Sequence, residues 1–137
     1  MRVGITSEII DAAGLIAEVG DPSAGATVLF LGTVRNHSEG KTGVTHLDYE
    51  AYPDVVVAKI EELVGAAASQ WELQAVVVEH RVGRVFVGES SVAVAVSAEH
   101  REEAFNAGRF LIDELKARAP IWKKEHWPGG AEWVAGA

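Results

Sequence analysis

The chain has 137 residues, of which 48% are hydrophobic and 23% charged, a composition typical of one globular domain rather than of a disordered chain. It contains no cysteine, which excludes disulfides, thiolate nucleophiles and cysteine-ligated metal sites. The formal net charge of −8 argues against nucleic acid as a partner. No apolar run approaches the roughly 20 residues of a membrane span, and the first residues do not resemble a signal peptide, so we expect a cytoplasmic protein without a membrane partner.

The first part of the chain is expected to form a helix and two strands. Thr6 or Ser7 can cap a helix over Glu8–Val19, because hydroxyl side chains accept hydrogen bonds from the free N–H groups of a first turn. The runs Ala26–Val34 and Val44–Tyr52 have strand character and flank a polar loop. They can therefore pair as a hairpin with a long loop.

Pro53 suits the first turn of a second helix that runs to about Gln70. Beyond it, three strands, a long helix and a final short strand are expected, and Gly83–Gly88 reads as a turn. In chain order these segments are Leu73–Val82, Ser90–Ala98, the helix Glu99–Ala117, Ile121–Trp127 and Glu132–Val134. Strands and helices do not alternate strictly, so we predict a single α+β domain over residues 1–137, with a mixed, largely antiparallel sheet flanked by about three helices.

Common ligand motifs are absent from the sequence. Gly40-Lys41 lacks the earlier glycine of a phosphate-binding loop, and no glycine pattern of the dinucleotide-binding type is present. The five histidines show no metal-ligand spacing, so no metal site and no cofactor are predicted.

Two clusters point to a small anionic ligand. In the first, the strand Ala26–Val34 delivers Arg35 and His37 to the start of a glycine-containing loop, an arrangement common in anion sites. The second is the long helix, with His100 and Arg101 at its N-terminal end and Lys116 at its C-terminal end.

Lys116 and Lys123 flank a proline turn and can converge. Close positive charges and apolar surroundings depress the pKa of a lysine, which makes such a side chain a candidate nucleophile or acid–base group. The structural alternatives are an exposed loop arginine at Arg35 and a helix-end charge at Lys116 that stabilises the helix dipole.

At these residues the sequence resembles the large-subunit family of the molybdopterin synthases. The resemblance covers about Ala26 to Val134 and lies in the order and spacing of several blocks. These are Phe30–Arg35, Leu47–Tyr52, His80–Gly83, Ser97–Arg101, Leu115–Glu125 and Trp133-Val134. The sequence departs from the pattern at Ile112, where some members have methionine, and in the short segment after Trp133-Val134, because some relatives have a longer tail.

The resemblance implies a sulfurtransferase. Cyclic pyranopterin monophosphate would receive two sulfurs from a small ubiquitin-like subunit whose C-terminal Gly-Gly carries a thiocarboxylate. It also implies the residues of the pocket. Lys116 and Lys123 would be catalytic, and substrate would be bound by Phe30, Arg35, His100 and Arg101.

Helix geometry adds an expectation about assembly. Arg101 and Lys116 are fifteen positions apart, about 22 Å along one helix, too far to grip one small pterin from the same chain. We therefore expect a homodimer with shared sites, within a heterotetramer that includes two carrier subunits. Two rival interpretations are a Schiff-base enzyme that uses a lysine on another anionic substrate and a non-catalytic anion-binding or adaptor module.

Overall fold

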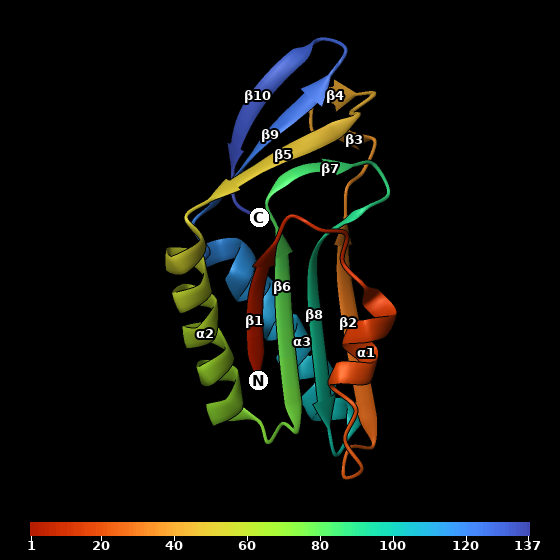
Figure 1. Ribbon diagram of the computed structural model, residues 1–137, viewed down its shortest axis with the longest axis vertical. Helices are drawn as coiled ribbons and strands as arrows, with labels where there is room; N and C mark the ends of the chain where they lie inside the picture. Colours follow the sequence, from red (N-terminus) through yellow and green to blue (C-terminus); the bar gives the residue numbers. More distant parts are fainter.

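The computed structural model describes residues 1–137 and contains two four-stranded sheets. Sheet 1 has the order β1 (Arg2–Thr6), β6 (Ala75–Arg81), β8 (Ser90–Ala98) and β2 (Ala26–Thr33), as Figure 1 shows. Its strands pair antiparallel except for β1, which runs parallel to β6. Sheet 1 forms the body of the molecule.

Sheet 2 lies across the end of sheet 1. Its order is β10 (Gly130–Ala135), β9 (Ile121–Trp127), β5 (His46–Ala51) and β7 (Gly83–Phe86), and all pairs are antiparallel (Figure 1). A small hairpin of β3 (His37–Ser38) and β4 (Lys41–Thr42) lies beside it. Because side chains alternate along a strand, sheet 2 presents different residues on its two faces.

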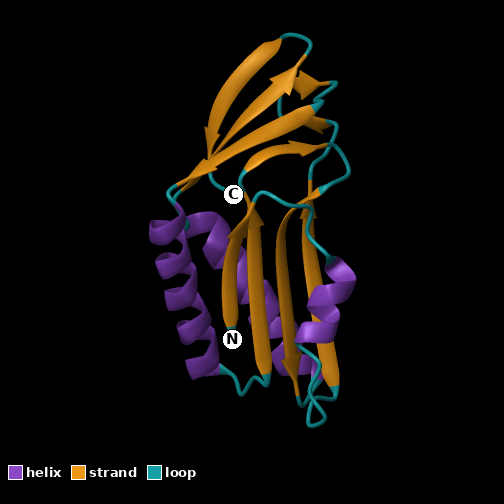
Figure 2. Ribbon diagram, viewed as in Figure 1, coloured by secondary structure: helices purple, strands orange, loops and turns teal.

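Three helices cover sheet 1 (Figure 2). The helices α2 (Pro53–Gln70) and α3 (Arg101–Arg118) pack on one face, and the short α1 (Ala12–Glu18) packs on the other. None of them combines the length and the apolar character that crossing a bilayer would require. The fold class expected from the sequence, α+β with a mixed and mostly antiparallel arrangement of strands and three helices, is confirmed.

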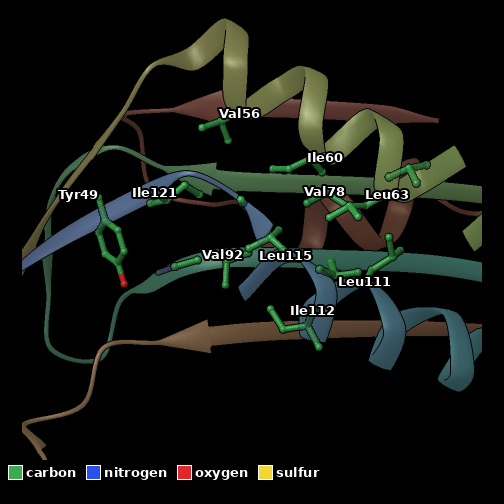
Figure 3. Packing of buried hydrophobic residues seen from close by; sticks show 14 of the residues in the cluster. Tyr49, Val56, Ile60, Leu63, Val78, Val92, Leu111, Ile112, Leu115 and Ile121 are labelled. Atoms are coloured by element: carbon green, nitrogen blue, oxygen red, sulfur yellow. The ribbon is translucent and has the colours of Figure 1, made fainter. Parts of the chain in front are cut away.

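The main core lies between sheet 1 and the two long helices and continues onto sheet 2 through residues such as Tyr49 and Ile121 (Figure 3). Strand β8 illustrates how the sequence creates two packing faces. Val92, Val94 and Val96 belong to the main core, whereas Ala93 and Ala95 belong to a smaller cluster beneath α1. Small alanines on that face suit the close approach of a helix to the sheet.

The structure corrects three local expectations in the first half of the chain. Residues 2–6 form an unexpected strand, β1. The first helix starts at Ala12, because the Asp11 carboxylate caps it by accepting a hydrogen bond from Gly14 N, whereas Thr6 Oγ1 accepts from Glu8 N in a turn before the helix. Strands β2 and β5 do not form a hairpin. Each pairs within a different sheet, β2 with β8 and β5 with β7 and β9.

Further along the chain the predicted boundaries of helices and strands agree better with the structure. The helix over Pro53–Gln70 and the strands Ser90–Ala98 and Ile121–Trp127 have the expected bounds. The segment expected to be a turn after β6 instead contains strand β7, which adds an edge to sheet 2.

Candidate functional site

A pocket of about 170 Å³ lies where the two sheets meet. Arg35 enters it directly after β2, and Lys116 enters it from the last turn of α3. Lys123 and Glu125 come from β9, where two residues of separation place them on the same face of sheet 2. The end of β2 and the α3–β9 region, which are distant in the sequence, thus bring an arginine and two lysines to one small volume of an acidic protein.

Lys116 contacts a main-chain oxygen inside this pocket. Its Nζ donates to the oxygen of Ala137, the last residue of the sequence, at 3.2 Å. The segment before Ala137 is held by a hydrogen bond from Gly136 N to the carbonyl oxygen of Ile121 at 2.9 Å. The Lys116 ammonium can therefore bind the oxygen of a peptide segment that enters the pocket.

Lys123 is held in an environment that disfavours its charge. Burial lowers the pKa of this lysine, and the nearby cations Lys116, Arg35 and Lys41 lower it further, whereas Glu125 opposes them. A larger fraction of the Lys123 amine is consequently neutral near physiological pH than for a solvated lysine. A neutral amine can act as a nucleophile or take up a proton.

Glu125 connects the pocket to the β3–β4 hairpin. Lys41 Nζ lies 2.6 Å from its Oε1, and Ser38 Oγ donates to the same oxygen at 3.1 Å. Lys41 also reaches Glu132 on β10 at 3.0 Å. Burial would raise the pKa of Glu125, but the Lys41 and Ser38 contacts outweigh it and lower that pKa. This network fixes the loop that carries Arg35.

His80 lies fully buried close to the pocket lysines. Its Nδ1 is 2.7 Å from the carbonyl oxygen of Arg81, which can only accept, so Nδ1 carries the proton. The ring of Tyr49, a pocket residue, meets it edge-on with centroids 5.1 Å apart. Burial lowers the pKa of His80 to about 4. The hydrogen bond to the Arg81 carbonyl opposes this shift, whereas the charges of Lys116 and Lys123 add to it. The imidazole therefore stays neutral at pH 7.

The structure brings together only part of the predicted site. Arg35, Lys116 and Lys123 line the pocket. Phe30 lies in a neighbouring groove of about 510 Å³, which shares Lys116 with the pocket and also contains Ile112. His100 and Arg101 lie at the opposite end of α3 from Lys116 and do not reach the pocket of their own chain.

Sequence reasoning missed two residues that line the pocket, Ser38 and Glu125, and two that lie beside it, Lys41 and His80. Lys41 and Ser38 lie in a loop that the sequence marks only as polar, and nothing there indicates a partner on β9. Glu125 could have been found, because it follows Lys123 by two positions in a predicted strand and so shares its face. His80 gave no local signal, because its burial depends on the packing of sheet 1.

Comparison with known proteins gives the family. The family model described as MoaE protein matches residues 5–118. The molybdopterin synthase catalytic subunit 1 of Mycobacterium tuberculosis is 41% identical over 95% of this chain and 88% of its own length. The molybdopterin synthase catalytic subunit of Bacillus subtilis is 37% identical over 97% of this chain and 84% of its own length.

Solved structures agree with these sequence relationships. The molybdopterin synthase structure from Staphylococcus aureus superposes with a TM-score of 0.89, at 30% identity over 95% of this chain and 94% of that one. A Helicobacter pylori structure, described as the complex of subunits 1 and 2 of molybdopterin-converting factor, has the same fold, with a TM-score of 0.79 at 21% identity over 96% of this chain and 89% of that one. From the family match and these relatives, the chain belongs to the MoaE protein family, whose members compared here are named molybdopterin synthase catalytic subunits.

Proposed function

We propose that this chain is the catalytic subunit of a molybdopterin synthase. It would transfer sulfur from the thiocarboxylated C-terminus of a small carrier subunit to cyclic pyranopterin monophosphate, forming the dithiolene of molybdopterin. The observation that carries the proposal is the pocket in which Arg35, Lys116 and Lys123 converge. Such a cluster suits a substrate that is a cyclic phosphate and a donor that ends in an anionic thiocarboxylate.

The absence of cysteine supports an external sulfur donor. A chain without a thiol cannot carry a persulfide, so the sulfur must arrive on another molecule. The carrier would enter as an extended Gly-Gly tail, because a backbone without side chains can thread a narrow opening. The contact between Lys116 Nζ and the main-chain oxygen of Ala137 supports Lys116 as the group that binds an oxygen of the carrier's terminal group.

The two lysines would have different tasks. Lys116 would orient and polarise the carrier's terminal group, and Lys123, whose pKa is lowered chiefly by burial, would exchange protons during transfer. Arg35 would hold the phosphate of the pterin. Phe30 would pack against the substrate from the neighbouring groove.

His100 and Arg101 would complete the site from a second copy of the chain. Helix α3 is continuous over Arg101–Arg118, which keeps Arg101 about 22 Å from Lys116 within one chain. A two-fold dimer brings the N-terminal end of one α3 to the pocket of its partner and creates two equivalent sites. With a carrier at each site the assembly is a heterotetramer. The Helicobacter pylori complex of subunits 1 and 2 is consistent with such a partner.

Reconstitution tests this function directly. The purified chain is incubated with a thiocarboxylated Gly-Gly carrier and the pterin precursor, and the dithiolene product is measured. We expect product with this carrier, none with the carboxylate form, and little when the carrier's last glycine is replaced by a bulkier residue. A folded chain that binds both ligands but forms no product would refute the proposal and favour the adaptor module, and borohydride trapping of Lys116 with a carbonyl substrate would favour the Schiff-base enzyme.

A further inference from the structure

Three potential metal ligands lie together on the face of sheet 2 that points away from the pocket. His46 and Asp48 are two residues apart on β5, so their side chains share a face. His126 on β9 is directly opposite His46 in the antiparallel register. The intervening residues Leu47 and Glu125 line the catalytic pocket on the other face. The cluster is therefore separate from the site of sulfur transfer.

The ligand atoms of the cluster are close enough for one ion. His126 Nε2 lies 2.8 Å and His46 Nε2 lies 3.9 Å from Asp48 Oδ2, and all three atoms lie within 4.8 Å of one another. The two imidazole rings stack with centroids 4.2 Å apart and planes inclined by 17°. Around a tetrahedral Zn²⁺ such atoms are about 3.3 Å apart, so small changes in side-chain torsion would suffice.

One hydrogen-bond arrangement around His46 leaves its inner nitrogen without a proton. Thr45 Oγ1 lies 2.9 Å from His46 Nδ1 and 3.5 Å from the carbonyl oxygen of His126. When the hydroxyl donates to this carbonyl, it accepts from Nδ1–H of His46. In this tautomer His46 Nε2 presents a lone pair, and it faces the Asp48 carboxylate, which also only accepts.

Two imidazole nitrogens of the cluster lack a hydrogen bond of good geometry, although His126 Nε2 lies only 2.8 Å from Asp48 Oδ2. The Nε2 atoms of His46 and His126 are both buried, and neither makes a hydrogen bond with acceptable geometry. Buried polar atoms normally find partners, and a shared cation satisfies two imidazoles and a carboxylate together. We propose that His46, Asp48 and His126 bind one divalent first-row transition-metal ion, with Zn²⁺ as the probe and water in the remaining position.

Asp48 is the negative charge of the cluster, and two cationic side chains, Arg84 and Lys124, lie near it. Arg84 contacts both carboxylate oxygens of Asp48, with Nε donating to Oδ1 at 3.1 Å and Nη2 donating to Oδ2 at 3.5 Å, so a metal ion at Oδ2 would replace only the longer contact. A hydrogen bond of this kind orients a metal-bound carboxylate. Lys124, opposite Asp48 in the register, lies over the ring of Trp133, with Nζ 5.7 Å from the centroid.

A metal ion here would join β5 to β9. The opposite face of the same two strands carries Tyr49, Lys123 and Glu125 of the pocket. The ion would thus brace the catalytic face of sheet 2 from behind without contacting substrate. Its binding can be measured independently of sulfur transfer.

Equilibrium dialysis of chelator-treated protein against Zn²⁺ tests the proposal. We expect one Zn²⁺ per chain, and at least tenfold weaker binding in His46→Ala, His126→Ala and the nearly isosteric Asp48→Asn. His100→Ala, which removes an exposed histidine, is the matched control and should bind normally.

Histidine NMR of the unmodified chain provides a second measurement that does not depend on the folding of variants. Zn²⁺ should shift the imidazole signals of His46 and His126 and leave those of His80 and His100 in place. The proposal is overturned if wild type binds no Zn²⁺, if the three variants bind it as tightly as wild type, or if the shifts occur at other histidines.

Discussion

Lys116 has two roles, one at the end of helix α3 and one inside the pocket. It lies in the last turn of α3, where a cation stabilises the helix dipole, and it donates one hydrogen bond to Ala137. Lys116→Ala should therefore cost only about 1 kcal/mol of stability while nearly abolishing product formation. Thermal unfolding and the reconstituted assay measure the two effects. Lys59→Ala on the exposed face of α2 is the control, and wild-type turnover in a folded Lys116→Ala chain would refute the assignment.

The pKa of Lys123 should depend on Lys116. Its pKa lies below the ordinary value of 10.5, first because of burial and then because of the neighbouring charge of Lys116. Lys116→Ala removes that charge and opens the pocket to water, so the pKa of Lys123 should rise toward its ordinary value. NMR titration of the lysine side chains measures this shift. An unchanged Lys123 pKa in that variant would mean that the two side chains do not interact.

The sequence identified the positive charges of the pocket but not the residues that surround them. Arg35, Lys116 and Lys123 were recognisable because cations at strand and helix ends suit an anion. Lys41 and His80 were not, since their roles depend on residues about 80 and 36 positions away that only the folded chain brings near. The stacked pair His46 and His126 escaped notice for the same reason. The two histidines are neighbours because of the register between β5 and β9, and not because of their spacing in the sequence.

The β3–β4 hairpin is anchored to sheet 2 by Lys41. Lys41 joins it to β9 and β10 through Glu125 and Glu132. Lys41→Met leaves the buried Glu125 with Ser38 as its remaining side-chain donor, so the melting temperature should fall at neutral pH and product formation should decrease as Arg35 loses its fixed position.

The pH dependence of the fall in melting temperature distinguishes the loss of the Lys41–Glu125 contact from a general disruption of the fold. The folded-state pKa of Glu125 is below its ordinary value of 4.5, so the ionised carboxylate stabilises the fold above about pH 4.5 and this contribution is lost as the pH falls through the folded pKa. The difference in melting temperature between wild type and Lys41→Met should narrow in acid. Lys59→Met, which removes an exposed ion pair with Glu62, should change little at any pH. A constant difference across the pH range would count against the Glu125 contact.

Elements with strong periodicity were predictable from the sequence, and strand partners were not. Helix α2 has a regular apolar stripe with proline in its first turn, and β8 alternates valine with alanine, so both had the expected bounds. Strand β1 has five residues, including a glycine, and pairs in parallel with β6, more than seventy positions away. Alternation determines which residues share a face, but it does not choose the neighbouring strand, so the division into two sheets was not foreseen.

The arrangement of the whole molecule separates the pieces of the predicted site. The pocket lies where the two sheets meet, at the C-terminal end of α3, whereas Arg101 lies at the start of that helix. The resemblance to the family implies that Arg101 and Lys116 belong to one pocket, but within one chain the two side chains are too far apart to share it. The proposed activity would therefore require an assembly in which α3 serves one site with its first turn and another with its last.

Complementation between two inactive variants tests this assembly. Arg101→Ala keeps its own Lys116, and Lys116→Ala keeps its own Arg101, so a mixed dimer contains one site with both side chains and one site with neither. With random subunit exchange half of the dimers are mixed, and about one quarter of wild-type activity should return. Exchange is verified with differently tagged chains, and a mixture of Arg101→Ala with itself is the control. Verified mixed dimers without activity, or an active monomer, would show that each site is built from a single chain.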